Sequence, residues 1–381
     1  MVLKIVIAPN ALKDSLTAFD AACAIEKGIL KNNPNEETVC IPIADGGDGL
    51  LQVVQQALKG EWKTLAVEDP LGRIIQAPVL YCPEKSLVMI ELASAAGLAL
   101  LEEQEYNIRK TSTFGVGQLL NAALDLNVNQ IILGIGGSAT NDAAMGIASA
   151  LGVKFRDKNG NELPSNACNL IKIEQIDCSL VNSKILSIKF DIICDVNNPL
   201  LGENGAAAIF GPQKGASPED VDFLEQGLSH FSDIIHRDFQ IDVSELEGGG
   251  AAGGVGAGLT ALFNANLCKG AELVLELLSF EDQIKDADLL ITAEGKIDKQ
   301  TGFGKAPYIA AKTAKKFNVP VYVVAGQADT DCLDELPVFN KLYTLTSREI
   351  TSDYAIRHAA LLMQQNAEAI MRDFQKIKRS E

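Results

Sequence analysis

Short apolar runs alternate with helix-like segments at both ends of this 381-residue chain. Near the start, residues 3–8 have the composition of a strand and residues 17–30 the spacing of a helix. Near the end, residues 288–292 and 306–317 repeat the same order. The strand-like runs are mostly apolar on both faces, which is typical of strands that are buried on both faces in parallel sheets. The sequence therefore predicts an α/β protein with mostly parallel sheets.

Length and glycine distribution predict two domains. The chain is long for a single core, and 47% of its residues are apolar, so large buried cores can form. The β-α-β pattern occurs at both ends, whereas the middle is richer in glycine and in long loops. We therefore expect residues 1–85 and 286–381 to form one discontinuous α/β domain, with an inserted α/β domain at 86–285.

Charge and cysteine usage exclude several classes of protein. A net charge of −17, from 33 basic and 50 acidic residues, argues against nucleic-acid binding, which depends on neutralising phosphates. There are eight cysteines, no C-x-x-C pair and only three histidines, which argues against structural zinc. Scattered cysteines are typical of a reducing compartment. With no signal-like start and no long apolar run, we expect a cytoplasmic protein that does not bind membranes.

The stretch 291–307, ITAEGKIDKQTGFGKAP, is a strong candidate for a ligand site. An apolar run opens there onto a polar loop, and a helix-like segment follows. In α/β proteins this order places loops above the ends of the strands, where ligands bind. The alternative is an ordinary solvated connection. The candidate residues are Glu294, Gly295, Lys296, Asp298, Gln300 and Thr301.

A second candidate is the turn GIGGSATNDAAMG at 134–146, which also lies between a strand and a helix. It fits G-x-G-x-x-A, and Asp157 follows at about the spacing of a dinucleotide fingerprint. Polar side chains crowd the turn, which favours a polar ligand at the start of the helix, and a structural cap is the remaining alternative. The candidate residues are Gly137, Ser138, Thr140, Asn141 and Asp142.

Two carboxylates lie close together in the stretch ADGGDG. Asp45 and Asp48 are separated by Gly46 and Gly47, which allow a tight turn. Paired carboxylates hold Mg²⁺ or accept a proton from a hydroxyl. The alternative is that Asp48 caps the helix that follows.

Asp195 is a further catalytic candidate, because it comes directly after an apolar strand and close to Asn198. A capping role is its alternative. Lys13 and Ser15, after the first strand, and Lys214, in GPQKGA, suit anionic ligands such as phosphates and carboxylates.

A glycine-rich run at 248–258 has seven glycines in eleven residues and includes Gly253 and Gly254. Backbone N–H groups in such a run could contact nucleotide phosphates. A hinge or a tight helix crossing would use the same residues.

Read together, these stretches resemble the bacterial glycerate kinase family of type I. They occur in the family's order and span nearly the whole chain. The first motif departs from the family's usual APDSFKGSLSA, and Asn10 removes a carboxylate there, so no catalytic role is expected at Asn10. The matching stretches are IVIAPNALKDSLTA (5–18), PIADGGDG (42–49), DPLGR (69–73), ELASAAGLALL (91–101), GIGGSATNDAAMG (134–146), CDVNNPLLGENGAAAIFGPQKGA (194–216), GGGAAGGVGAGL (248–259) and ITAEGKIDKQTGFGKAP (291–307).

The resemblance implies an enzyme that transfers the γ-phosphoryl group of ATP to D-glycerate. The expected product is 2-phosphoglycerate, in glycerate and glyoxylate catabolism, with Mg²⁺ as cofactor. The resemblance also implies a flavodoxin-like domain inserted into a Rossmann-like one, with the active site in the cleft between them. The sequence does not determine the oligomeric state, and a homodimer is one of the states it allows.

The family match suggests roles for the candidate residues. Asp195 orients or deprotonates the attacking hydroxyl, and Asp45 and Asp48 hold Mg²⁺ or the acceptor. Lys13 and Lys296 neutralise phosphate or the glycerate carboxylate.

Two residues have weaker assignments. Asp298 shares a wall of the cleft with Lys296, and Arg73 is a candidate for bidentate pairing with the glycerate carboxylate.

Two other functions stay open from the residues alone. One is a nucleotide-dependent oxidoreductase that uses the G-x-G-x-x-A turn at 134–139. The other is a ligand-binding relative without catalytic activity.

Overall fold

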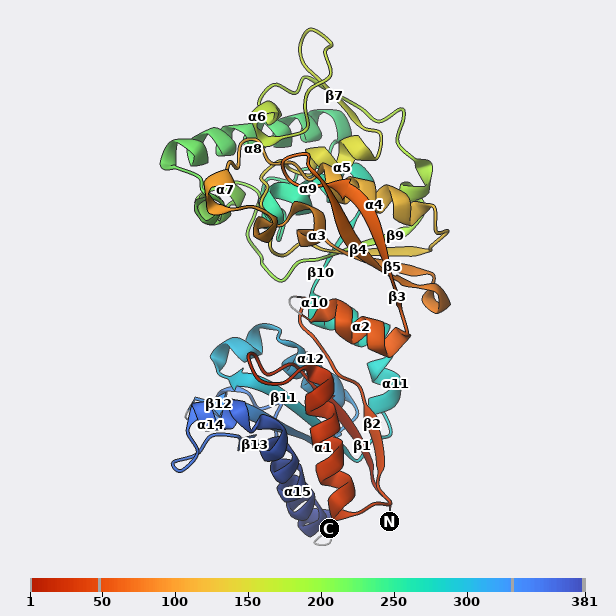
Figure 1. Ribbon diagram of the computed structural model, residues 1–381, viewed down its shortest axis with the longest axis vertical. Helices are drawn as coiled ribbons and strands as arrows, with labels where there is room; N and C mark the ends of the chain where they lie inside the picture. The colour runs from red at the N-terminus through yellow and green to blue at the C-terminus, as the bar shows by residue number, and fades with distance from the viewer. Residues whose placement is uncertain (1, 47–48, 330–331, 379–381) are drawn as a thin grey trace. The chain divides into compact units, whose positions relative to one another are not determined.

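The computed structural model describes residues 2–46, 49–329 and 332–378 (Figure 1). Gly47 and Asp48, both predicted site residues, therefore lie outside the described residues. The chain divides into two compact α/β units with mostly parallel sheets, as the sequence predicts. Unit 1 comprises Met1–Ala57 and Lys269–Glu381, and unit 2 comprises Leu58–Cys268.

Unit 1 is built on a five-stranded sheet in which all strands are parallel, in the order β13-β12-β11-β1-β2. The strands are β1 (Lys4–Pro9), β2 (Glu37–Cys40), β11 (Leu289–Ile297), β12 (Val321–Ala328) and β13 (Lys341–Thr344). The helices are α1 (Ala18–Asn32), α2 (Leu50–Leu58), α10 (Gly270–Leu277), α11 (Phe280–Ile284), α12 (Ala306–Lys316), α13 (Cys332–Glu335), α14 (Ser352–Arg357) and α15 (Ala359–Lys378), with a short 3₁₀ helix η6 (Lys299–Phe303).

Each face of this sheet buries its own core. Alternate residues of β1 point to opposite faces: Ile5 and Ile7 pack toward α1 and α15, and Val6 and Ala8 toward α10, α11 and α12. This two-sided burial explains why Ile5 to Ala8 are all apolar rather than alternating with polar residues. Helices α1 and α15 run side by side (Figure 1).

Glycine makes that helix contact possible. A Cβ atom added at Gly28 of α1 would lie 2.3 Å from the carbonyl oxygen of Gln364 in α15. Only a residue without a side chain allows the two backbones to approach so closely.

Unit 2 contains a six-stranded sheet in the order β10-β9-β6-β5-β4-β3. The first four strands are parallel to one another, and β4 and β3 add an antiparallel hairpin at one edge. The strands are β3 (Glu61–Glu68), β4 (Ile74–Cys82), β5 (Leu87–Glu91), β6 (Gln130–Gly134), β9 (Lys189–Ile193) and β10 (Asn266–Cys268), and a separate pair is formed by β7 (Lys154–Arg156) and β8 (Gln175–Asp177).

The helices of unit 2 enclose one continuous apolar core. They are α3 (Ala93–Ala96), α4 (Phe114–Leu124), α5 (Met145–Ala150), α6 (Ala167–Leu170), α7 (Ala206–Phe210), α8 (Pro218–Phe239) and α9 (Ala251–Phe263), with 3₁₀ helices η1 (Pro83–Lys85), η2 (Leu98–Leu100), η3 (Glu103–Glu105), η4 (Ser183–Leu186) and η5 (Pro212–Lys214). No helix in the described part of the chain is long and apolar enough to cross a membrane.

The unit boundaries differ from the predicted 85/86 and 285/286. Strands β3 and β4 belong to unit 2, because β4 pairs with β5 and the hairpin contributes Val67 and Val79 to that core. Helices α10 and α11 belong to unit 1, because Leu275 and Phe280 pack in the core around α12. In both places tertiary pairing, which local sequence does not reveal, decides the boundary.

The strand orders also differ from the domain labels that the resemblance implied. Counted within unit 1, the order is 2-1-3-4-5, which is the flavodoxin-like order rather than the Rossmann-like order expected there. In unit 2 the parallel strands follow one another across the sheet in chain order, without the reversal of a flavodoxin-like sheet.

Candidate active site

Unit 1 presents a polar cluster at the carboxyl ends of β1 and β11. These strands are neighbours in the sheet, and the order reverses between them. In doubly wound sheets, ligands bind outside the carboxyl ends of the strands at such a reversal. The loops that follow β1 and β11 therefore occupy the position where a ligand is expected.

Asn10, Asp45 and Glu294 form the centre of this cluster. The Nδ2 group of Asn10 donates to Oδ2 of Asp45 at 2.9 Å and to Oε2 of Glu294 at 3.2 Å. Asn10 and Glu294 are each only 8% exposed. A single amide thus holds two carboxylates that would otherwise repel each other.

Glu294 has an unusual protonation equilibrium. Burial raises the pKa of its carboxyl to about 7, and the charge of Asp45 adds to that rise. The charge of Lys305 and the hydrogen bond from Asn10 act in the opposite direction. A carboxyl with a pKa near neutrality can exchange a proton under physiological conditions.

Asp45 also binds the start of α12. Its Oδ1 atom accepts the backbone N–H of Ala306 at 2.6 Å. A carboxylate at a helix N-terminus is stabilised by unpaired N–H groups and by the helix dipole. Asp45 therefore connects the loop after β2 to the helix that follows the stretch 291–307.

The structure places the residues of that stretch differently from the sequence prediction. Glu294, Gly295 and Lys296 lie within β11, which continues to Ile297. Lys296 is half exposed and pairs with Asp298 at 3.5 Å and with Asp329 at 3.2 Å.

The rest of the stretch folds on itself. Asp298 caps η6: its Oδ1 atom accepts the N–H of Gln300 at 3.0 Å, and Thr301 Oγ1 accepts the N–H of Asp298 at 3.1 Å. These contacts are structural, and they fix the loop between β11 and α12.

Two cavities open beside the loop after β1. One, of about 560 Å³, is lined by that loop and the start of α1, by Ile43 and Ala44, and by residues of α2. The other, of about 350 Å³, extends from Lys13 and Ser15 across the ends of β11, β12 and β13. Both predicted anion-binding residues of the first loop therefore line a cavity.

Unit 2 carries a separate buried polar cluster in the turn after β6. Asp142 is fully buried, and its Oδ2 atom accepts from the N–H of Thr113 at 2.8 Å, from its hydroxyl at 2.9 Å and from the N–H of Gly146 at 3.2 Å. Oδ1 of Asp142 and both polar side-chain atoms of Asn141 have no partner among the described residues.

Lys214 points into this cluster. It is 3% exposed, and its Nζ atom donates to the carbonyl oxygen of Thr140 at 2.7 Å and to Oγ of Ser138 at 3.2 Å. Burial lowers the pKa of Lys214 to about 7, against the opposing charge of Asp142. Burial raises the pKa of Asp142.

The glycine-rich run packs against the same turn. It forms α9, whose backbone is left-handed at Ala252, Gly253 and Gly254. A Cβ atom at Gly253 would lie 2.2 Å from the carbonyl oxygen of Thr140, and the N–H of Ala143 donates to the Gly253 carbonyl at 3.0 Å. The sequence left a hinge and a tight helix crossing open, and these contacts show the tight crossing.

Gly137 adopts φ +69°, a left-handed conformation that glycine favours, with Ala93 close by. Asp195 is exposed, two residues beyond the end of β9, and Asn198 donates through Nδ2 to the carbonyl oxygen of Asn204 at 2.8 Å.

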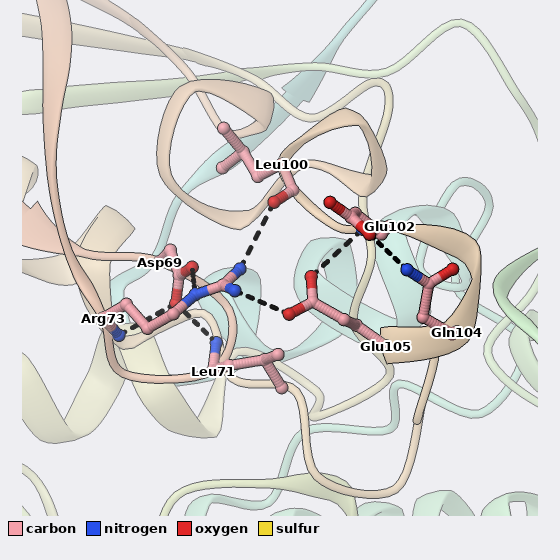
Figure 2. Close-up of polar contacts among 7 residues, drawn as sticks. All are labelled: Asp69, Leu71, Arg73, Leu100, Glu102, Gln104 and Glu105. Atoms are coloured by element: carbon pink, nitrogen blue, oxygen red, sulfur yellow. Dashed lines mark hydrogen bonds and ion pairs between the residues drawn. The ribbon is translucent and has the colours of Figure 1, made fainter.

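Arg73 has protein partners on both sides of its guanidinium (Figure 2). Its Nε atom pairs with Asp69 at 2.5 Å and its Nη1 atom with Glu105 at 2.7 Å. Burial alone would raise the pKa of Asp69, but the backbone N–H and guanidinium of Arg73 and the N–H of Leu71 hold it below its ordinary value. These contacts form a structural brace within the β3–β4 turn, and the carboxylate-binding role of Arg73 stays a prediction.

Comparison with known proteins identifies the family. The model of the glycerate kinase family matches residues 5–375. The chain belongs to this family. It is a kinase.

Several relatives match over most of their length. A "Glycerate kinase" from Halalkalibacterium halodurans is 44% identical over 96% of this chain and 97% of its own. A "Glycerate 2-kinase" from Escherichia coli is 41% identical over 86% of each chain. A crystal structure of a candidate glycerate kinase 2 from Salmonella typhimurium LT2 has a TM-score of 0.90 and 37% identity and covers 100% of both chains.

For a kinase of this family, the described residues fit a magnesium ion that is bound mainly through its nucleotide. Among them, no group of three or more His, Cys, Asp or Glu side chains could hold a metal by itself. Mg²⁺ usually keeps several waters and is bound through one or two carboxylates plus substrate phosphates. Asp45 and Glu294, brought together by Asn10, supply a donor set of that size.

Sequence reasoning missed two residues of the unit 1 cluster. Asn10 was set aside because it lacks a carboxylate, yet its position directly after β1 was a signal that it borders the site. Lys305 was not singled out, although it is the N-cap residue of α12 and its charge acts on Glu294.

Proposed function

We propose that this kinase transfers the γ-phosphoryl group of ATP to the 2-hydroxyl of D-glycerate. A bond forms between the hydroxyl oxygen and the γ-phosphorus, and the bond between that phosphorus and the β–γ bridging oxygen breaks. The hydroxyl proton leaves to a base, and the products are ADP and 2-phosphoglycerate. The reaction belongs to the breakdown of glycerate and related organic acids.

The names of the relatives support the substrate and the position of transfer. Halalkalibacterium halodurans provides a relative named as a glycerate kinase, and Escherichia coli one named as a glycerate 2-kinase. Both matches cover most of the chain. The membership of the family also favours a kinase over the oxidoreductase that the turn at 134–139 left open.

The observation that carries the proposal is the cluster of Asn10, Asp45 and Glu294 at the reversal in strand order of unit 1. Phosphoryl transfer requires positioning and neutralisation of charge rather than covalent chemistry by the protein. Carboxylates for a metal, lysines for phosphates and a helix N-terminus meet that requirement together.

Individual residues have distinct proposed roles. Lys13 and Lys296 neutralise phosphate charge, and Asp195 orients the attacking hydroxyl and accepts its proton. Asp45 and Glu294, with Asp48, hold the magnesium ion, which when bound supplies positive charge at the phosphate oxygens. Ser138, Thr140 and Asn141 form a polar turn that contributes to ligand binding in unit 2.

A cytoplasmic location is consistent with this role. The cysteines at 23, 40, 82, 168, 178, 194 and 268 are free thiols, as expected in a reducing compartment.

The decisive test is ADP release by the purified protein with and without D-glycerate, with L-glycerate as a control. Phosphorus NMR of the product distinguishes 2-phosphoglycerate from 3-phosphoglycerate. Release of ADP that does not depend on D-glycerate would refute the proposed activity, and 3-phosphoglycerate alone would refute the position of transfer.

Asp195→Asn tests the base. This substitution keeps the shape of the side chain and removes its basicity, so we expect kcat to fall by more than about tenfold, or about 1.4 kcal/mol of barrier. A smaller fall would exclude the proposed base role of Asp195 and leave the proposed reaction intact.

A further inference from the structure

The cavity of about 350 Å³ in unit 1 has the position and size of a site for a small molecule. It is lined by residues that follow β1, by the carboxyl ends of β11 and β12, by the segment after β13 and by α14. Four adjacent parallel strands thus end at one cavity, beside the reversal between β1 and β11. Ligands of doubly wound sheets bind at this position.

One side of the cavity is apolar. Leu12, Leu345, Ala355 and Ile356 line it, and Ile356 is 45% exposed. We call this apolar side of the cavity the slot. It is suited to a nucleobase and its sugar rather than to a small polar acid.

The polar side chains of these walls are bound to other protein groups. Ser15 Oγ donates to the carbonyl oxygen of Ile356 at 3.1 Å, and Thr346 Oγ1 donates to that of Gly326 at 3.1 Å. These bonds hold the first loop, β12 and α14 in fixed relation within the unit. The slot is therefore built before any ligand binds.

Two glycines form part of the lining between the walls. Gly295 and Gly326 lie side by side, and a Cβ atom at Gly326 would lie 2.5 Å from the carbonyl oxygen of Gly295. Without side chains at these positions, the cavity keeps its depth, and a ligand can approach the backbone.

The other side of the cavity is cationic. Lys13, Lys296 and Lys305 line it together with Glu294. Lys305 is also the N-cap residue of α12, so the positive end of the dipole of an 11-residue helix lies beside it. Lysines next to a helix N-terminus suit a chain of phosphates.

We propose that this cavity binds the nucleoside part of the phosphoryl donor, with the phosphates directed toward Lys13 and Lys305. The inference rests on the proposed function in one respect, that the donor is ATP. Glycerate has no apolar part and would leave the slot unfilled. An apolar slot with a cationic end matches a nucleoside triphosphate in both shape and charge.

Two substitutions test the slot without altering the lysines. Ala355→Trp fills it with a bulky side chain, and Ile356→Glu places a negative charge at its exposed edge. Leu361→Glu is the matched control, because Leu361 is a similarly exposed apolar residue, at 51%, that does not line the cavity. Circular dichroism establishes that each variant is folded.

The measurements are calorimetric titration with ATP and with inorganic tripolyphosphate, and the KM values for ATP and D-glycerate. We expect both slot variants to weaken ATP binding and to raise its KM by about tenfold or more, which is about 1.4 kcal/mol. The KM for D-glycerate and the behaviour of Leu361→Glu should not change. Tripolyphosphate, which has no base, should bind Ala355→Trp as it binds the unaltered protein.

The outcomes separate this inference from the proposed function. Unchanged ATP affinity in folded Ile356→Glu would overturn the inference, and so would a rise confined to the KM for D-glycerate. If the variants lose ATP binding but the unaltered protein does not phosphorylate D-glycerate, the inference stands and the proposed function falls.

Discussion

Lys214 shows how burial of one side chain can couple stability to pH. Its pKa is about 7 in the folded chain, below the ordinary value of 10.5, because burial disfavours the charged form. Between these two values the unfolded chain binds more protons than the folded one. The free energy of unfolding should therefore increase as pH rises above 7, and this contribution is lost as pH falls through 7.

We expect Lys214→Met to flatten this pH dependence. The substitution keeps the length of the side chain and removes its titration. Urea unfolding at pH 7, 8 and 9 measures the slope, and Lys158→Met, at an exposed position, is the control. Equal slopes in Lys214→Met and the unaltered protein would contradict the assigned cause.

Asn10 gives a second prediction at this scale. Asn10→Leu removes the donor that both Asp45 and Glu294 share, and it leaves two neighbouring carboxylates without that hydrogen bond. We expect a loss of about 1–3 kcal/mol in the free energy of unfolding, measured with urea at pH 8. An unchanged midpoint would show that other groups compensate for the missing amide.

Site residues could be predicted from the sequence where they follow an apolar strand. Asp45 and Glu294 were found in this way. Lys214 was predicted on the strength of a neighbouring glycine, and its burial could not be foreseen. Asn10 was missed because the cluster depends on a donor shared between segments that are 284 residues apart, and local sequence carries no signal for that contact.

Helices and strands were predictable where their apolar pattern is strong. The segments at β1, α1, β11 and α12 all occur near their expected residues. The run at 248–258 was not assigned to a helix, because each glycine in a helix costs up to about 1 kcal/mol relative to alanine. Close packing on the turn after β6 explains why glycine is used there instead.

The contact between α1 and α15 leads to a prediction at this scale. In an unconstrained helix, Gly28→Ala would stabilise by about 0.5–1 kcal/mol. Here the added methyl group would meet the Gln364 carbonyl, so we expect a net loss of about 1–3 kcal/mol. Thermal unfolding provides the measurement, and Lys27→Ala, at an exposed position on the same helix, is the control. A raised midpoint for Gly28→Ala would refute the close packing.

The whole molecule consists of two units with separate apolar cores. The core of unit 2 draws its residues from Val67 to Ala265, entirely within Leu58–Cys268. The distribution of glycine and loops predicts an inserted domain, and the structure divides the chain at Leu58 and Lys269. Each end is decided by which sheet or helix layer an element joins.

This organisation predicts that residues 58–268 fold alone. The fragment keeps all six strands of its sheet and its complete core, so we expect a cooperative thermal transition and native-like circular dichroism. The fragment 86–285 lacks β3 and β4 and carries α10 and α11 without their partners. It should aggregate or unfold non-cooperatively, and equal behaviour of the two fragments would contradict the boundaries.

The pairing of β1 with β11 has a consequence for synthesis on the ribosome. Strand β1 emerges first, but its neighbour β11 is more than 280 residues further along the chain. At 5–20 residues per second, the intervening segment takes roughly fifteen seconds to a minute to appear. During that interval the inserted unit can complete its own fold, while the edge of β1 that later pairs with β11 has no partner strand. Because β2 pairs with the opposite edge of β1, no strand made earlier covers the edge that β11 will occupy, and the nascent chain depends on a chaperone to shield it until β11 is made.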